Sequence, residues 1–60
     1  MILPADAFML LSVVNTKLRD EYPSLARLCE EEGADETEIV SRLAALGYRY
    51  DGSANAFKNL

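Results

Sequence analysis

The residues best equipped for chemistry are carboxylates, which gather in the middle of the chain. Six acids and no base occur between Glu30 and Glu38, in a chain of 60 residues whose net charge is −4. These acids are Glu30, Glu31, Glu32, Asp35, Glu36 and Glu38. We interpret the segment as a solvated surface or, alternatively, as a docking patch for a basic protein partner. A divalent-metal site is the weakest interpretation, because the acids lack the interleaved spacing of a calcium loop.

The usual catalytic pairs of nucleophile and base are missing. The sequence contains no His, which removes Ser–His and Cys–His pairs and the commonest zinc ligand. Its one cysteine, Cys29, falls on the apolar side of a predicted helix, which favours a buried, inert thiol over a nucleophile. We therefore expect a protein that is not an enzyme and that takes no metal or cofactor.

Length and composition indicate one small domain over residues 1–60, half of it hydrophobic. Domains of this size bury only about 60% of their unfolded surface, so they gain from a partner. The N-terminus lacks the basic segment of a signal peptide, and the longest apolar stretch, Ala7 to Leu11, is far below the roughly 18 residues of a membrane span. A single cysteine excludes an internal disulfide and suits a reducing compartment. We expect a cytoplasmic protein with no membrane partner.

Capping residues and breakers divide the first part of the chain into three helices. Asp6, Ser24 and Asp35 are suited to cap a helix at its start, and Gly33 and Gly47 to end one. Helices are accordingly predicted over about 7–21, 24–32 and 35–46, the first ending before the Tyr22-Pro23 break.

The C-terminal part predicts a short hairpin over about 48–58. Tyr48 and Tyr50 point to one side of a strand and Arg49 to the other. Asp51-Gly52 signals a tight turn, and a longer loop with Asn55 in a left-handed conformation is an equal alternative. A lone hairpin is barely stable in water, so this one must pack on the helices, with Phe57 as its anchor. The tyrosines are expected to pack rather than to stack on nucleobases.

These elements predict a mainly α fold. It is a three-helix bundle in which the second and third helices pack like a helix-turn-helix, followed by the hairpin in a winged-helix-like arrangement. Phe8, Leu10, Leu11, Val14 and Leu18 share one broad face of the first helix. The predicted core consists of Leu11, Val14, Leu18, Leu25, Leu28, Ile39, Leu43, Leu46, Tyr48 and Phe57.

A second, smaller apolar strip on the first helix consists of Met9 and Val13, nearly opposite the core-facing side. Three interpretations stay open: scattered surface apolarity, a cover formed by Ile2-Leu3 or by Leu60, and a homodimer contact. The dimer contact is the functional hypothesis, because small domains often gain stability by association.

The helix-turn-helix pattern raises the alternative of a DNA-binding transcription regulator. In that motif the N-terminal residues of the second helix face base edges, and here they are Glu36, Thr37 and Glu38. Contacts to phosphate would fall to Lys17, Arg19, Arg42, Arg49 and Lys58. Because phosphate neutralisation drives most of the affinity for DNA, the acidic helix start disfavours duplex DNA as a partner.

The sequence also resembles a known family. The most specific parts of the resemblance are the run from Asn15 to Asp20 and the element Gly47-Tyr48-Arg49-Tyr50-Asp51, with Asn55 and Phe57. They resemble a family of very short bacterial proteins described only as a domain of unknown function, over nearly the whole chain from Leu3 to Phe57. The resemblance implies a bacterial, cytoplasmic, stand-alone protein, and it implies no catalytic residue or cofactor. The sequence departs from the family at Gly52-Ser53-Ala54, where charged residues are expected.

The functional expectation is therefore a non-enzymatic interaction module. Its biochemical role is unknown, its expected partner is a second copy of the chain, and a basic protein is a further candidate partner. The alternative is the DNA-binding regulator.

Overall fold

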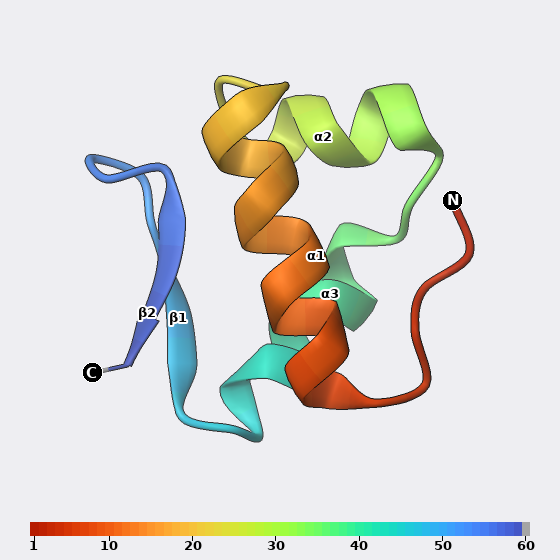
Figure 1. Ribbon diagram of the computed structural model, residues 1–60, viewed down its shortest axis with the longest axis vertical. Helices are drawn as coiled ribbons and strands as arrows, with labels where there is room; N and C mark the ends of the chain where they lie inside the picture. The colour runs from red at the N-terminus through yellow and green to blue at the C-terminus, as the bar shows by residue number, and fades with distance from the viewer. Residues whose placement is uncertain (60) are drawn as a thin grey trace.

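Three helices are followed by a two-stranded antiparallel sheet in the computed structural model, which describes residues 1–59 (Figure 1). The helices are α1 (Ala7–Asp20), α2 (Leu25–Glu32) and α3 (Glu36–Ala44), and the strands are β1 (Tyr48–Asp51) and β2 (Ala56–Asn59). Residues 33–35 form the turn between α2 and α3. The prediction of a mainly α fold with a C-terminal hairpin is confirmed.

Each helix begins at the polar residue that the sequence singles out. The Asp6 carboxylate accepts hydrogen bonds from the backbone N–H groups of Phe8 and Met9, at 2.8 and 3.3 Å. Ser24 and Asp35 cap α2 and α3 in the same way. These caps satisfy donors at the helix starts that have no partner within the helix. Gly33 ends α2 with φ of 66°, a left-handed conformation that glycine adopts without steric cost.

The third helix is shorter than the sequence predicts. It ends at Ala44 rather than near residue 46, because its last turn tightens. The N–H groups of Leu46 and Gly47 donate to the carbonyls of Leu43 and Ala44, three residues back, instead of four. Such tightening is common where a helix closes. Gly47 then takes φ of 85° and directs the chain into β1.

The hairpin has the longer of the two loops that the sequence allows. Asp51 pairs with Ala56, so residues 52–55 form the connection. The Asp51 carboxylate accepts from the Ser53 N–H at 2.9 Å and from the Ser53 hydroxyl at 2.7 Å, and Asn55 takes φ of 52°. These contacts, together with a third from the Ala54 N–H, lower the pKa of Asp51. The loop is therefore ordered by its own side chains.

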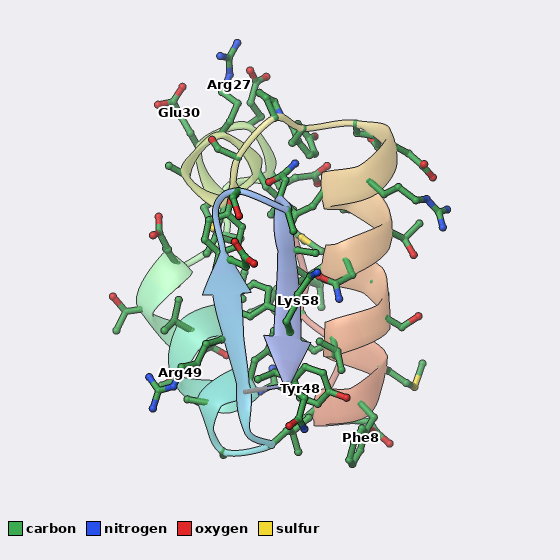
Figure 2. All side chains as sticks on the ribbon, turned by 90° about the vertical axis from the view of Figure 1, so that its left-hand side faces the viewer. Phe8, Arg27, Glu30, Tyr48, Arg49 and Lys58 are labelled. Carbon is green, nitrogen blue, oxygen red and sulfur yellow. The ribbon has the colours of Figure 1, made fainter. Side chains whose placement is uncertain are left out.

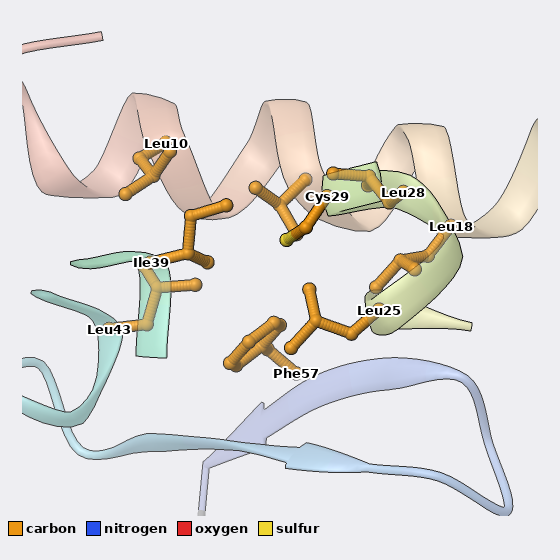
Figure 3. Packing of buried hydrophobic residues seen from close by; sticks show 9 residues of the cluster. Leu10, Leu18, Leu25, Leu28, Cys29, Ile39, Leu43 and Phe57 are labelled. Atoms are coloured by element: carbon orange, nitrogen blue, oxygen red, sulfur yellow. The ribbon is translucent and has the colours of Figure 1, made fainter. Parts of the chain in front are cut away.

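The core lies where the inner face of α1 meets α2, α3 and the hairpin (Figure 3). Leu10, Val14 and Leu18 form one row along α1, at the spacing of successive helical turns. Phe57 rises from β2 into the same cluster. The buried set is Leu10, Val14, Leu18, Leu25, Leu28, Cys29, Ile39, Leu43 and Phe57.

Five apolar positions differ from the predicted core, and one of them is Cys29, which is buried on the apolar side of α2. Leu10 occupies the central position that the sequence predicts for Leu11. The side of α1 that faces the core is the one that carries Leu10, Val14 and Leu18. Leu11 is only partly buried, at the edge of the cluster. Leu46 lies beyond the end of α3 and Tyr48 at the open end of the hairpin, so both are also partly buried rather than central.

Two asparagine amides tie the hairpin to the helices. The Asn15 side chain donates to the carbonyl of Phe57 at 3.1 Å and accepts from its N–H at 2.8 Å. The Asn55 amide donates to the carbonyls of Leu18 and Tyr22, both at 2.9 Å. Its oxygen accepts from the Tyr50 hydroxyl at 2.8 Å. Asn55 therefore satisfies carbonyls at the end of α1 that would otherwise lack partners.

The segment before α1 is tied to the opposite side of the molecule. The Met1 amino group donates to the carbonyl of Glu32 at the end of α2. Arg42 of α3 donates to the carbonyls of Pro4 and Ala5, at 2.6 and 2.9 Å. In Figure 1 this segment accordingly runs along the side of the bundle away from the hairpin.

We predict that Asn55→Gly lowers the free energy of unfolding by about 1–3 kcal/mol, because it removes three hydrogen bonds at part-buried groups. Asn55→Ala is expected to cost about 1 kcal/mol more, since alanine resists the left-handed backbone. Urea denaturation followed by circular dichroism measures both. The control Ser12→Ala, at an exposed site on α1, should change stability by no more than about 0.5 kcal/mol. Equal effects of Asn55→Gly and the control would contradict the structural role of the amide.

Candidate functional site

Two of the cations proposed to contact phosphate have roles inside the fold. Lys17 Nζ lies 3.2 Å from Glu32 Oε2 and 3.5 Å from Glu21 Oε2. Its pKa is raised, chiefly by the hydrogen bond to Glu32. Arg42 is committed to the carbonyls of Pro4 and Ala5. Neither side chain is placed to face a ligand.

The other three cations do not converge either. Arg19 lies on α1 and is paired with its neighbour Asp20, with Nε 2.8 Å from Oδ1. Arg49 and Lys58 lie opposite each other across the hairpin and are exposed (Figure 2). Within residues 1–59 no carboxylate forms an ion pair with either side chain. Of the predicted phosphate contacts, the exposed side chains are thus Arg49 and Lys58 on the hairpin and Arg19 on α1.

The six acids of the segment from Glu30 to Glu38 make different interactions. Asp35 caps α3, and Glu38 lies 3.8 Å from Arg42 one turn later. Glu31 pairs with Arg27 at 2.7 Å. In the part of the chain that the structure describes, only Glu30 and Glu36 of the six make no side-chain hydrogen bond or ion pair. That part also contains no group of three metal-ligating side chains close enough to hold an ion.

The sixth acid, Glu32, is the centre of a small polar network. Its Oε2 accepts from the Tyr22 hydroxyl at 2.6 Å and from Lys17 Nζ at 3.2 Å. The pKa of Glu32 is lowered, first by the tyrosine and then by the lysine. The hydrogen bond to the carboxylate raises the pKa of Tyr22 to about 12. The network joins the end of α1 to the end of α2, so Glu32 is an internal link rather than a docking residue.

The remaining reactive side chains are packed. Cys29 is a free thiol, 7% exposed, in the core. Burial raises its pKa, and the nearby Glu36 and Asp35 carboxylates add to the shift, so the thiol stays protonated. Tyr50 packs on Phe57 with ring centroids 5.6 Å apart, and its hydroxyl also accepts from the Leu25 N–H at 3.2 Å. Tyr48 is half-buried.

The apolar strip on α1 is exposed, but its composition differs from the prediction. Met9 is 59% exposed, whereas Val13 is half-buried. Phe8, which the helical pattern places on the core-facing side, is 64% exposed. It lies at the edge of that face in the first turn, where it projects from the end of the molecule opposite Arg27 (Figure 2).

The residues predicted to cover the apolar strip are Ile2-Leu3 and Leu60. Ile2 is 97% exposed and covers nothing, and Leu3 packs against the core instead. Leu60, the other proposed cover, lies outside the described residues.

A groove of about 550 Å³ opens beside this strip, between α1 and the tip of the hairpin. It is lined by Ser12, Asn15, Thr16, Leu18 and Arg19 of α1 and by Ala54, Asn55 and Ala56. The amides of Asn15 and Asn55 are occupied by the backbone contacts that hold the hairpin. Among residues 1–59 no buried side-chain nitrogen or oxygen lacks a hydrogen-bond partner. The groove therefore combines apolar walls with the exposed side chains of Ser12, Thr16 and Arg19, while its two amides are already engaged.

Sequence reasoning missed both Phe8 as a surface residue and the groove. One signal was available for the first: no charged residue occurs from Ala7 to Thr16, which is unusual for ten residues of an amphipathic surface helix. The groove had no such signal, because it depends on how the tip of the hairpin meets α1.

Among residues 1–59 no helix combines the length and apolarity needed to cross a membrane.

The Glu32 network predicts a pH dependence of stability. The pKa of Glu32 is lower in the folded chain than the ordinary value of 4.5, so its contribution is complete above that value and is lost as pH falls through the folded pKa. The pKa of Tyr22 is raised, so a second loss is expected between pH 10.0 and about 12. Urea denaturation should show that Glu32→Gln is less stable than the wild type at neutral pH and that the difference shrinks in acid. Glu30→Gln, an exposed neighbour, should track the wild type throughout. A constant difference between Glu32→Gln and wild type across the acid range would refute the linkage.

Comparison with known proteins gives one match. Residues 4–57 match the model of a family described as a domain of unknown function, DUF4250. No curated protein and no solved structure matches the chain. The match covers most of the 60 residues, so the chain belongs to the DUF4250 family of domains of unknown function.

Proposed function

We propose that the protein is a non-enzymatic interaction module that forms a homodimer through the outer face of α1. The observation that carries the proposal is the exposure of Phe8 and Met9, at 64% and 59%, next to each other in the first turn of the helix. Single exposed apolar residues are ordinary, but adjacent large ones on an uncharged helical stretch favour a contact surface.

The uncharged stretch supports this surface. From Ala7 to Thr16 the outward positions are Phe8, Met9, Ser12 and Thr16, with Val13 half-buried beside them. Contact there would remove apolar area from water without desolvating an ionised group. The charges of α1 lie beyond this stretch, at Lys17, Arg19 and Asp20, so they would form the rim of an interface.

The size of the molecule limits the strength of the dimer. The accessible surface is 3722 Å². A standard specific interface buries about 800 Å² per partner, roughly a fifth of this total. One helix face and its surroundings supply less than that, so we expect a dissociation constant in the micromolar range or weaker.

A non-enzymatic role is supported by the engagement of the reactive groups. The thiol of Cys29 is in the core, and four of the six clustered acids cap a helix or pair with a neighbouring side chain. The docking of a basic protein on the acids gains no support from this arrangement, because Glu30 and Glu36 lie on different helices.

For the DNA alternative we predict no binding. A labelled random-sequence duplex titrated with the protein to about 100 μM at low salt should show unchanged fluorescence anisotropy, because non-specific binding needs a set of phosphate contacts. The exposed cations Arg19, Arg49 and Lys58 are too few, and the start of α3 is acidic. Binding that weakens steeply with added salt would instead support the DNA-binding regulator.

For the dimer we predict a mass above 6.7 kDa in sedimentation equilibrium as the concentration rises from about 1 μM to about 1 mM. Met9→Glu should raise the dissociation constant at least about tenfold by placing a charge in the contact. The fold should tolerate this change, because an acid in the first turn of a helix is favourable. Ile2→Glu, a change of the same kind at a side chain that is 97% exposed, should have no effect. A constant mass of 6.7 kDa for the wild type would exclude the proposal.

A further inference from the structure

We infer that the groove between α1 and the hairpin tip is a binding site for the Phe8 side chain of a second copy, and that two such contacts form at once. The inference rests on the proposed dimer and specifies its geometry. It gives the groove an occupant, and it gives the exposed ring of Phe8 a place to bind.

The first argument is the position of Phe8 relative to the groove. At 100° per residue, Phe8, Ser12, Asn15 and Arg19 lie in one row along α1. The last three line the groove, and Phe8 lies at the N-terminal end of the same row. The ring and the groove are thus on one side of the helix, too far apart along it for Phe8 to fill its own groove.

The second argument is symmetry. A twofold dimer pairs a surface patch with itself. A twofold axis that passes between the two helices, at a right angle to both, reverses the direction of the partner helix and keeps each residue on the same side. The midpoint between Phe8 and the centre of the groove, near Asn15 and Thr16, lies at Ser12. An axis at Ser12 therefore places each Phe8 over the groove of the other copy.

The residue at the crossing point suits this arrangement. Ser12 is small and exposed, so two helices can approach toward the short end of the usual range of about 8–10 Å between axes. Met9 then lies opposite Thr16 of the second copy, and neither side chain carries a charge. The centre of the contact is thus free of steric and electrostatic conflict.

Charge complementarity selects the antiparallel orientation. The same axis brings Asp6, at the start of one α1, close to Arg19 at the end of the other. A parallel pair would instead place Asp6 beside Asp6 and Arg19 beside Arg19. Arg19 is available, because its side chain is 72% exposed and its present partner is the adjacent Asp20. Such rim charges fix orientation more than affinity.

The lining of the groove can accept an aromatic side chain. Its amides are already bound to the backbone, and its other walls include Leu18, Ala54 and Ala56. An aromatic ring gains apolar contact with these walls, and the two occupied amides keep their partners. Buried aromatic side chains in pockets dominate the energetics of many interfaces.

The test uses one variant for the ring and one for the groove. Phe8→Ala removes the ring, and Thr16→Trp fills the groove from an exposed position on α1. Each variant should raise the dissociation constant of the dimer at least about tenfold. The contact between Phe8 and the groove occurs twice in the dimer, so each substitution removes both copies of it. Thermal melts should stay close to the wild type, since both positions are exposed. Val40→Ala, which truncates an exposed apolar residue on α3, is the matched control and should leave association unchanged.

Mixing the two variants gives the sharper result. In the mixed dimer, the intact Phe8 of the Thr16→Trp chain enters the open groove of the Phe8→Ala chain. At the other site the truncated residue leaves room for the introduced indole. The mixture should therefore associate more strongly than either variant alone. The chain has no Trp of its own, so a blue shift of the indole emission on mixing reports the contact directly.

The outcomes separate this inference from the proposed function. A wild type that stays monomeric overturns both. If the wild type dimerises and both Phe8→Ala and Thr16→Trp dimerise with the same dissociation constant, the groove contact is overturned. The proposed dimer itself then still stands. Weakened variants whose mixture shows neither recovery nor a blue shift also overturn the groove contact, because the ring and the groove then do not meet.

Discussion

The fold depends on the docking of the hairpin by the two amides of Asn15 and Asn55. A two-stranded hairpin has little stability of its own, and this one carries Phe57, which completes the core. Asn15 pairs with both backbone groups of Phe57, much as a neighbouring strand would. Asn55 completes the hydrogen bonding at the end of α1. Two polar side chains thus determine where the last apolar residue of the core is held.

The predictable parts of this structure are the local ones. Asp6, Ser24, Asp35 and Gly33 mark helix ends by chemistry that acts within a few residues, so the helices were predictable. The rotation of α1 that buries Leu10 in place of Leu11 depends on how the other elements pack against it. The same holds for the groove and for the roles of Lys17, Glu32 and Arg42, whose side chains have hydrogen-bond partners 10 to 38 residues away in the chain. The spacing of residues in a single sequence does not indicate which distant residues form such contacts.

The residues on which the family resemblance rests have structural roles here. Asn15, Leu18 and the Tyr50–Phe57 pair all lie at the contact between α1 and the hairpin, and Asn55 connects them. In this structure these residues fix the position of the hairpin against α1. The most specific parts of the resemblance therefore describe the scaffold, and Phe8 and Met9, which we propose for recognition, lie outside those parts.

The contact between Asn15 and Phe57 joins residues that are distant in the chain, and this affects the order of folding. Asn15 and Phe57 are 42 residues apart, so their contact closes most of the chain into one loop. A synthesised chain folds from its N-terminus, and helices form faster than distant pairings. The three helices are therefore made before β2, and the core is complete only when Phe57 is available. A chain that is truncated before β2 keeps its helical sequences but loses the element that closes the core, so it becomes an early target for proteolysis.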